Sequence, residues 1–375
     1  MTDTAVPTTC RELRSTVTDD SEATLVIGEC EVPAPGPDEV VVRVEAAPIN
    51  PSDLGLLFAM GDISKAEAID GGFRIPLTPG VLAANRARVG IAMPAGNEGG
   101  GTVVAAGSSP DAQALVGKVV GFLSGNAYAE YRTVHRQSCV PMSDGVTAEQ
   151  AAASFVNPLT ALGMVETMRM EGHSGLVHTV GASNLGLMLN RICLADGVPL
   201  VNIVRRPEHV ELLRGEGAEH VVDSSADSFD DDLRAALQAT GATIAFDAIG
   251  GGDLASTLLA AMERVASEGA AFSRYGSDTN KQVYIYGSLD RSPTVLHRTF
   301  GLSWSVSGWL LTPFLGKIGA DGAARLRQRV ADEITTTFAS RYGMRVTLDE
   351  AVDPEVAGRY GRMASGDKAL VVPHG

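Results

Sequence analysis

The sequence lacks the features that mark membrane, secreted and nucleic-acid-binding proteins. None of its 375 residues lie in a stretch long and apolar enough to span a bilayer. The polar segment Met1–Thr9 has no hydrophobic region of the kind that a secretory signal needs. The formal net charge of −15 is opposite in sign to the charge that binds phosphate backbones. We therefore expect a cytoplasmic protein that binds neither membranes nor nucleic acid.

Cysteine is scarce, and no two cysteines form a C-x-x-C pair. The four cysteines are widely separated: Cys10, Cys30, Cys139 and Cys193. This spacing argues against a zinc-binding lobe or a disulfide framework, and it fits a reduced cytosolic compartment. His173 and His178 have no cysteine or further carboxylate arranged around them. The sequence therefore predicts no metal site.

The first third of the chain alternates short β-rich runs with Gly/Pro turns. The runs predicted as strands are Thr24–Ile27, Val40–Glu45, Gly101–Ala105 and Lys118–Phe122. Strands without long helices between them indicate an antiparallel or barrel-like domain. We interpret Asp62–Arg88 as a long surface excursion with a short helix.

From about Thr147 the pattern changes to helices, and then strands and helices alternate. The predicted helices are Ala148–Ser154, Thr160–Met170, Gly186–Leu194, Glu208–Arg214, Asp231–Thr240 and Leu254–Ala266. The predicted strands are Gly175–Val180, Leu200–Val204, His220–Val222, Ile244–Ala248 and Val283–Gly287. This βαβ rhythm predicts an α/β fold with a doubly wound parallel sheet.

The C-terminal part returns to the first domain. It contains a predicted amphipathic helix, Ala323–Phe338, and short strands near Arg345–Thr347 and Ala369–Val372. We therefore expect a dinucleotide-binding domain at 147–320, inserted into a discontinuous catalytic domain at 1–146 and 321–375.

The string Gly181-Ala182-Ser183-Asn184-Leu185-Gly186 lies between a predicted strand and a predicted helix. It matches the G-x-G-x-x-G element that binds the pyrophosphate of a dinucleotide, except that Ser183 replaces the middle glycine. Gly181 would permit the sharp turn out of the strand, and Gly186 would let the helix pack close. Amides at the helix N-terminus would face the pyrophosphate, and the Ser183 hydroxyl could bond a phosphate oxygen. An ordinary turn that binds nothing is the alternative.

Arg205 and Arg206 end the second strand of this unit, where an acidic residue would bind a free ribose 2′-OH. A guanidinium instead suits the 2′-phosphate of NADPH, which an acidic residue would repel. We therefore predict NADPH as the cofactor. The alternative is that the two arginines are ordinary exposed loop residues without a ligand. Two later strands end in Gly250-Gly251 and in Tyr286-Gly287, which would border the cofactor at the carboxyl ends of the strands.

Several strings together resemble the medium-chain dehydrogenases/reductases, in the zinc-free branch of quinone oxidoreductases and 2-enoyl thioester reductases. The strings cover nearly the whole chain: 47–53, 96–99, 127–131, 157–161, 181–186, 201–207, 246–251 and 286–287. The resemblance implies a GroES-like domain, an inserted Rossmann domain, NADPH in the cleft between them, and a homodimer. It also implies no zinc, because Asn50-Pro51-Ser52-Asp53 stands where zinc-dependent relatives place a cysteine ligand.

The resemblance further implies roles for three residues. Asn50 and Thr160 match positions near the nicotinamide, as donors to the substrate or to the cofactor amide. Each also has a structural interpretation, since Asn50 precedes a proline turn and Thr160 starts a predicted helix, where threonine caps well. Lys368 resembles a family lysine near the cofactor, and an exposed surface lysine is the alternative.

One departure from the family bears on the substrate. Enoyl reductases of this type carry a tyrosine shortly after the Asn-Pro-Ser-Asp string, and residues 54–62 contain none. We therefore expect NADPH-dependent hydride transfer to a quinone or an α,β-unsaturated carbonyl compound, with a proton from water. The alternative is an NADPH-binding protein without turnover, such as a sensor or a ζ-crystallin-like protein.

Overall fold

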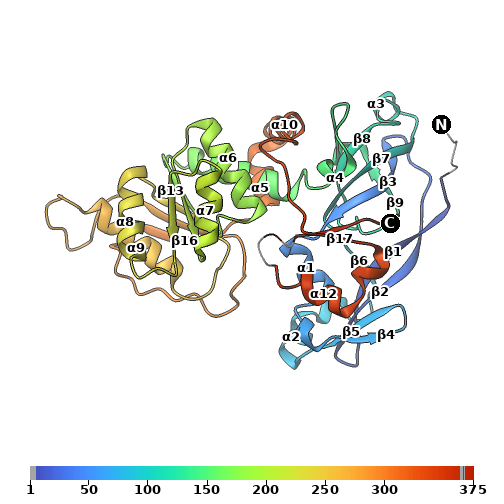
Figure 1. Ribbon diagram of the computed structural model, residues 1–375, viewed down its shortest axis with the longest axis horizontal. Helices are drawn as coiled ribbons and strands as arrows, with labels where there is room; N and C mark the ends of the chain where they lie inside the picture. Colours follow the sequence, from blue (N-terminus) through green and yellow to red (C-terminus); the bar gives the residue numbers. More distant parts are fainter. Residues whose placement is uncertain (1–5, 364–365, 367) are drawn as a thin grey trace. The chain divides into compact units, whose positions relative to one another are not determined.

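The computed structural model describes residues 6–363, 366 and 368–375, and the chain forms two compact units (Figure 1). The first unit is Met1–Val156 with Arg327–Gly375, and the second is Asn157–Leu326. Residues 147–156 therefore group with the first unit and residues 321–326 with the second, which differs from the expected boundaries. The assignment of catalytic and dinucleotide-binding roles to the units stays a prediction.

The first unit is built from mainly antiparallel sheets. One sheet has the order β4-β5-β2-β1-β6, and the other has the order β10-β8-β7-β3-β18-β17, with β9 also paired to β3. The strands are β1 Thr9–Val17, β2 Glu22–Glu31, β3 Glu39–Pro48, β4 Glu67–Ile69, β5 Gly72–Pro76, β6 Met93–Pro94, β7 Glu98–Ala106, β8 Val119–Leu123, β9 Tyr131–His135, β10 Cys139–Pro141, β17 Met344–Val346 and β18 Ala369–Val371. Three of the predicted N-terminal strands lie within β2, β3 and β7, and the fourth, Lys118–Phe122, begins one residue before β8. The C-terminal strand β18 pairs with β3, so the end of the chain forms part of this sheet.

The segment Asp62–Arg88 is more ordered than we expected. It contains the hairpin β4–β5, and β5 pairs with β2. Phe73 and Ile75 are fully buried on one face of β5 and alternate with Arg74. The strands are too short for this alternation to stand out in the sequence. The expected short helix is α2, Pro79–Ala84, which Thr78 caps.

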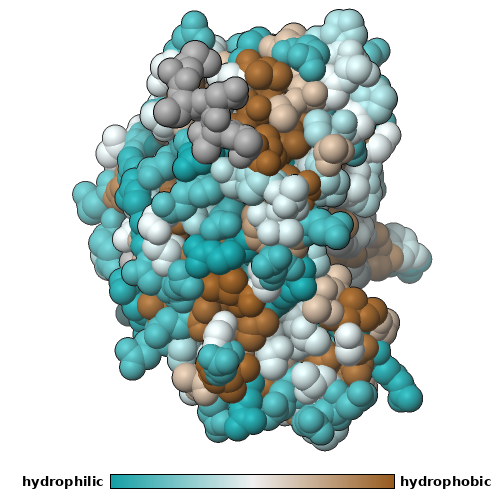
Figure 2. Space-filling model, turned by 90° about the vertical axis from the view of Figure 1, so that its right-hand side faces the viewer, coloured by the Kyte–Doolittle hydropathy of each residue, from teal (hydrophilic) through white to brown (hydrophobic). Residues whose placement is uncertain are grey.

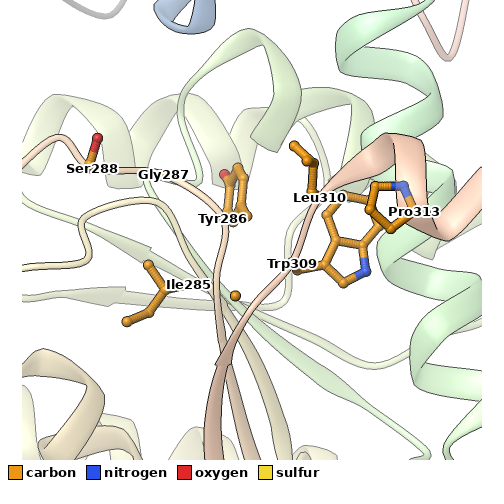
Figure 3. Close-up of a pocket in the computed structure, with 8 residues that line it drawn as sticks. Ile285, Tyr286, Gly287, Ser288, Trp309, Leu310 and Pro313 are labelled. Atoms are coloured by element: carbon orange, nitrogen blue, oxygen red, sulfur yellow. The ribbon is translucent and has the colours of Figure 1, made fainter. Parts of the chain in front are cut away.

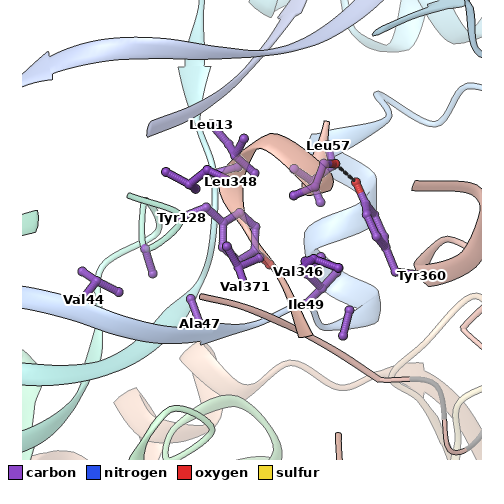
Figure 4. Packing of buried hydrophobic residues seen from close by; sticks show 14 of the residues in the cluster. Leu13, Val44, Ala47, Ile49, Leu57, Tyr128, Val346, Leu348, Tyr360 and Val371 are labelled. Carbon is purple, nitrogen blue, oxygen red and sulfur yellow. Dashed lines mark hydrogen bonds between the residues drawn. The ribbon is translucent and has the colours of Figure 1, made fainter. Parts of the chain in front are cut away.

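Short helices complete the first unit around a core centred on Tyr128. The helices are α1 Pro51–Leu57, α2, α3 Pro110–Gln113, α4 Ala148–Ala151, α11 Leu348–Ala351 and α12 Pro354–Tyr360, with 3-10 turns η1 Ile63–Lys65, η2 Arg86–Arg88 and η3 Arg136–Ser138. Tyr128 packs among Leu13, Leu348 and Val371, which come from distant parts of the sequence (Figure 4). The N-terminal and C-terminal segments therefore share one core.

The second unit is a parallel sheet with helices on both faces, as predicted. The sheet order is β13-β12-β11-β14-β15-β16, so the direction of winding reverses between β11 and β14. The strands are β11 Leu176–Thr179, β12 Leu200–Val204, β13 His220–Asp223, β14 Ile244–Asp247, β15 Lys281–Ile285 and β16 Trp304–Gly308. Ligands of such sheets bind at the carboxyl ends of the strands, next to this reversal.

The helices of the second unit divide between the two faces of the sheet. They are α5 Val156–Met170, α6 Asn184–Asp196, α7 Pro207–Gly215, α8 Phe229–Thr240, α9 Leu254–Ala266 and α10 Leu311–Asp332. Residues of α8 and α9 pack with Val177 and Val201 on one face, whereas α6 and α7 pack with Val204 on the other. In Figure 1, α8 and α9 lie together on one side of the sheet.

Helix α10 corrects the predicted helix Ala323–Phe338. It begins at Leu311, is interrupted at Gly319, where φ is 73°, and ends at Asp332. Because Gly319 interrupts the helical pattern of apolar residues, the turns before it were not predicted as helix. The helix ends earlier than predicted, before the run Thr335-Thr336-Thr337, whose β-branched side chains have low helix propensity.

The surface mixes residue types. Figure 2 shows hydrophobic residues as separate patches among hydrophilic ones. Exposed hydrophobic side chains of the first unit include Ile69, Ile91 and Val116. Of the helices in the described ranges, none is both long and apolar enough to cross a membrane.

Candidate functional site

The predicted dinucleotide turn joins β11 to α6 in the second unit. Ser183 is the N-cap residue of the helix, and its Oγ accepts a hydrogen bond from the Gly186 N–H at 3.0 Å. The Gly181 N–H donates to the Ile203 carbonyl at 3.0 Å, which ties the turn to β12. The Ser183 oxygen thus caps the helix, and its hydroxyl hydrogen remains to donate to a phosphate oxygen. The turn presents the N-terminus of a 13-residue helix at the carboxyl edge of the parallel strands, where sheets of this class bind ligands.

Gly186 has the packing role that we predicted. A Cβ there would lie 2.2 Å from the Gly181 carbonyl oxygen, so only glycine lets α6 approach the turn this closely. Gly181 is also crowded, with a Cβ position 2.9 Å from Asn202 Oδ1. The left-handed backbone of the turn lies at the preceding residue, Val180, with φ of 59°. A β-branched residue at this φ is a strained outlier of the sort that clusters at functional sites.

Arg205 and Arg206 follow β12 directly, at the sheet edge that carries the turn. Strands β11 and β12 are parallel neighbours, with Thr179 opposite Ile203, so their carboxyl ends lie together. Both arginine side chains are exposed. Arg206 Nη1 lies 3.8 Å from Glu208 Oε1, and such an exposed pair is weak. The structure therefore places both guanidinium groups where a 2′-phosphate could be reached, and the role itself stays a prediction.

The loops after β14 and β15 pack against each other, backbone to backbone. Gly250 has φ of 81°, and a Cβ there would lie 2.7 Å from the Gly287 carbonyl oxygen. A Cβ on Gly287 would lie 2.5 Å from the Ala248 carbonyl oxygen. A Cβ on Gly251 would meet Asp290 at 2.7 Å. These glycines approach protein atoms, and their predicted contact with a cofactor stays a prediction.

Thr179 and Asp247 shape the first of these loops. The Asp247 carboxylate accepts hydrogen bonds from the Ile249 N–H at 2.9 Å and the Gly250 N–H at 3.1 Å. Thr179 Oγ1 donates to Asp247 Oδ1 at 3.1 Å and accepts from the Ala248 N–H at 2.8 Å. Because β11 and β14 are neighbours at the reversal of the sheet, these bonds fix the backbone where a cofactor would lie. Asp247 lies in the string 246–251 that carries the family resemblance, whereas no role was predicted for Thr179.

Tyr286 and Trp309 line a cavity of about 380 Å³ at the ends of β15 and β16 (Figure 3). Leu310 and Pro313 continue its wall, so the lining is mainly apolar. The Trp309 indole N–H donates to Thr167 Oγ1 at 3.0 Å, which fixes the ring against α5. Trp309 therefore both packs and lines the cavity, whereas Trp304 packs edge-on against Phe300 at 4.8 Å between ring centroids.

His178, in β11, contacts the side chain of Tyr286. Its Nε2 lies 2.7 Å from the Tyr286 hydroxyl oxygen, and the two rings stack at 5.8 Å. Burial lowers the pKa of His178 to about 3, so the imidazole is neutral near neutral pH. A lone histidine in a strand gave no sequence signal for this contact, because its partner follows a strand 108 residues later.

Thr160 does not cap a helix. Helix α5 already begins at Val156, so Thr160 lies in its second turn, where it is buried. The expected helix start was late because Pro158 suggested a boundary, although proline is tolerated in a first helical turn. Thr160 belongs to the second unit, and its predicted contact with the nicotinamide or substrate stays a prediction.

In the first unit, Asn50 links two charged side chains. It is the N-cap residue of α1, which begins at Pro51. Its Nδ2 donates to Glu98 Oε1 at 2.9 Å, and Lys368 Nζ donates to its Oδ1 at 2.9 Å. Glu98 Oε2 in turn accepts from the Phe155 and Val156 N–H groups at 2.8 and 3.0 Å. The chain of contacts Glu98–Asn50–Lys368 fixes the orientation of the Asn50 amide.

Burial changes the charge balance of this cluster. It raises the pKa of Asp53 to about 6, against hydrogen bonds from the Asn50 and Asn97 N–H groups at 2.8 and 2.9 Å. Burial also raises the pKa of Glu98, against the positive charge of Lys368. The pKa of Lys368 is lowered by burial, although both carboxylates oppose the shift. The sequence signal that could have pointed to Glu98 is its place in the glycine-rich string 96–101. A carboxylate buried there must have hydrogen-bonding or charged partners.

The exposure of the cluster revises the expected role of Asn50. Its side chain is only 1% exposed, whereas Lys368 is half-buried. Lys368 is thus the outward-facing end of the contacts within this unit. Over the described ranges, no three His, Cys, Asp or Glu side chains gather as a metal site would require, and the metal-free prediction stays a prediction.

Comparison with known proteins finds relatives and solved structures, although no family model matches the chain. The synaptic vesicle membrane protein VAT-1 homolog of Rattus norvegicus is 28% identical over 244 residues, which are 64% of this chain and 54% of that protein. A quinone oxidoreductase of Pseudomonas aeruginosa is 31% identical over 194 residues, which are 51% of this chain and 52% of that protein. The chain spans about half the length of the curated relatives it matches.

A crystal structure from Mesorhizobium loti, of a candidate NADPH:quinone reductase, has a TM-score of 0.73 and 28% identity and covers 98% of this chain and 100% of that one. The chain belongs to the medium-chain dehydrogenase/reductase superfamily. Enoyl reductases are among its other similar proteins. As a medium-chain dehydrogenase/reductase, it combines a GroES-like β-rich domain with an inserted Rossmann domain, which confirms the predicted fold class.

Proposed function

We propose that this medium-chain dehydrogenase/reductase is an NADPH-dependent reductase of quinones or α,β-unsaturated carbonyl compounds. The observation that carries the proposal is the glycine turn at the N-terminus of α6, with Arg205 and Arg206 at the end of the neighbouring strand. The names of the Mesorhizobium loti and Pseudomonas aeruginosa proteins support the same class of reaction.

The backbone geometry of the turn supports binding of a dinucleotide diphosphate. The positions of Gly181 and Gly186 leave no room for a Cβ, so the backbone lies open at the helix N-terminus. N–H groups of the first helical turn and the helix dipole favour an anion there. NADPH, when bound, supplies a hydride from C4 of its nicotinamide. Arg205 and Arg206 would hold the 2′-phosphate, and the loops at Gly250 and Gly287 would position the rest.

In the first unit, we assign polarisation of the substrate oxygen to Lys368, with Asn50 as the residue that positions it. Lys368 Nζ is anchored on Asn50 Oδ1, and Glu98 holds the other end of the amide. A protonated Lys368 would donate a hydrogen bond, and then a proton, to the oxygen of the reduced substrate and recover the proton from water. This assignment supplies a donor in place of the tyrosine that residues 54–62 lack.

Two further features belong to the same proposal. We propose that the reaction needs no zinc, because the Asn50–Asp53 string supplies an amide and a carboxylate that bind protein groups.

We also propose a homodimer, since β16 lies at the edge of its sheet and such edges tend to be covered. Gel filtration with light scattering measures the second feature.

The direct experiment mixes the purified protein with NADPH and a panel of quinones and enones. We expect acceptor-dependent oxidation of NADPH well above the protein-free rate. Binding of NADPH, seen as a change in its fluorescence, without oxidation by any acceptor would instead support a cofactor-binding protein without turnover. Absence of NADPH binding would contradict both alternatives.

A further inference from the structure

Cys10 and Cys30 are far apart in the sequence but directly opposite each other in the fold. They are register partners on the antiparallel strands β1 and β2 of the first unit. Their Sγ atoms lie 3.3 Å apart. The spacing of the four cysteines in the sequence gave no sign of this contact, which arises only because the β1–β2 hairpin brings Cys10 and Cys30 together.

The strand geometry suits a covalent bond between the two sulfurs. The Val32 N–H donates to the Thr8 carbonyl at 2.8 Å, so Thr8 and Val32 form a hydrogen-bonded pair. Cys10 and Cys30 lie two residues along each strand and are therefore a pair of the same kind. The Cα atoms of such pairs are about 5.5 Å apart, within the range that disulfides span. The sulfur atoms would have to approach by only about 1.3 Å to reach bonding distance.

The two thiols differ in their surroundings. Cys30 is half-buried, and Arg132 Nη1 donates to its Sγ at 3.2 Å. Cys10 is 5% exposed, and burial together with the hydrogen bond to Cys30 raises its pKa to about 12. Arg132 is itself held by Glu12 and by the Asn126 carbonyl, so its position beside Cys30 is fixed. The more exposed sulfur, beside Arg132, is therefore the one placed to meet an oxidant first, and Cys10 lies directly behind it as the second sulfur.

We propose that Cys10 and Cys30 are a redox modification site that hydroperoxides convert to a reversible disulfide. The Cys30 thiolate attacks one oxygen of hydrogen peroxide, the O–O bond breaks, and hydroxide leaves with a proton from solvent as water. Cys10 Sγ then attacks the sulfur of the Cys30 sulfenic acid, and the departing hydroxyl takes the Cys10 proton as a second water. The two sulfurs lose two electrons in total and the peroxide gains them. External dithiols reverse the reaction by thiol–disulfide exchange.

The other two cysteines provide internal controls. Cys139 and Cys193 are buried, at 8% and 2% exposure, in β10 and α6. Burial alone raises the pKa of Cys139 to about 12, with no neighbouring arginine among the causes. A general oxidation of the protein would consume these thiols as well, whereas the proposed reaction consumes two of the four.

The experiment treats the full chain with hydrogen peroxide, blocks the remaining thiols with iodoacetamide, and measures intact and peptide masses. We expect a mass loss of about 2 Da before blocking, corresponding to two hydrogen atoms. Two of the four cysteines should be blocked, a disulfide-linked peptide pair should contain Cys10 and Cys30, and dithiothreitol should restore all four thiols. Circular dichroism confirms that the oxidised chain stays folded.

Variants test the order of the two steps. Cys30→Ser should abolish disulfide formation, whereas Cys10→Ser should stop at a Cys30 sulfenic acid that dimedone traps. Cys193→Ser should leave the disulfide yield unchanged. The proposal is overturned if the folded protein keeps four free thiols, if the linked pair contains Cys139 or Cys193, or if Cys30→Ser still forms the disulfide. Because Cys30 is half-buried, its serine variant tests the idea even if Cys10→Ser fails to fold. None of these readouts depends on NADPH or on turnover.

Discussion

Arg205 and Arg206 are the residues on which the preference for NADPH depends. We expect that replacing the dominant arginine with glutamine raises the Kd for NADPH tenfold or more, since a hydrogen bond to a charged group contributes about 1.5–3 kcal/mol. The Kd for NADH should not change. Fluorescence titration of Arg205→Gln, Arg206→Gln and the double variant measures both values. Arg214→Gln is the matched control, because Arg214 is exposed in the last turn of α7, the helix that follows the arginine pair. Unchanged NADPH affinity in the double variant would refute the assignment.

Lys368 should set the alkaline limit of turnover. It can donate a proton only while protonated, and burial lowers its pKa. Activity should therefore fall as the pH rises through this lowered pKa. Lys368→Met should reduce kcat and remove this limb of the profile, whereas Lys317→Met, an exposed control in α10, should preserve both. An alkaline limb that survives in Lys368→Met would show that another group supplies the proton.

At the residue level, the sequence predicted where residues lie relative to a neighbouring strand better than which side chains they contact. The turn residues 181–186 and the arginine pair could be predicted because their spacing relative to a strand is local. The partners Glu98 of Asn50, His178 of Tyr286 and Cys10 of Cys30 could not, since each contact joins residues 20 or more positions apart in the sequence. Asn50 is an example: its match to the family did not indicate that its amide oxygen accepts a hydrogen bond from Lys368.

The turn between β11 and α6 is the element that the cofactor proposal needs most. Gly186→Ala should force α6 away from Gly181, because the new Cβ would lie 2.2 Å from the Gly181 carbonyl oxygen. Overpacking of this kind costs about 1–3 kcal/mol of unfolding free energy, and NADPH affinity should fall as well. Gly215→Ala, at the end of α7, has no atom within 4 Å of its Cβ and should be neutral or slightly stabilising. Urea denaturation and NADPH titration compare the two. Equal effects of both substitutions would contradict the close-packing argument.

Strand β11 carries a pH-dependent contribution to stability at His178. Its pKa is about 3 in the folded chain and about 6.5 when unfolded, so only the unfolded state takes up a proton between these values. Stability from this group is complete above about pH 6.5 and falls on acidification, by about 2 kcal/mol at about pH 5. Urea denaturation of the wild type and of His178→Gln, at about pH 6.5 and about pH 5, measures the contribution of His178 to the free energy of unfolding. The variant should lose this part of the pH dependence, and an equal slope in both proteins would show that His178 titrates normally.

Prediction of elements succeeded where periodicity was long and failed where it was interrupted. Strand β12 and helix α9 have the predicted bounds, because Leu200–Val204 is a continuous apolar run and Leu254–Ala266 is a continuous apolar helix face. The hairpin β4–β5 was missed because its strands are short. Helix α10 was misplaced because Gly319 breaks its pattern. Strand β16 was missed because its sequence, Trp304–Gly308, is rich in serine.

At the scale of the whole chain, the medium-chain dehydrogenase/reductase fold gathers the proposed functions into two units. The second unit supplies the turn and the arginine pair, and the first supplies the Glu98–Asn50–Lys368 contacts. The order of strands and helices predicted the inserted Rossmann domain. The substrate could not be predicted, because the apolar cavity at Tyr286 and Trp309 is assembled from loop residues whose sequence has no periodic pattern.

The most direct test of the account compares kcat/KM for NADPH and for NADH with one quinone or enone acceptor, in the wild type and in the Arg205→Gln/Arg206→Gln double variant. We expect acceptor-dependent oxidation with NADPH preferred roughly tenfold or more, and loss of that preference in the double variant through a lower kcat/KM for NADPH alone. Equal use of both cofactors by the wild type, or no oxidation of either with any acceptor, would contradict it.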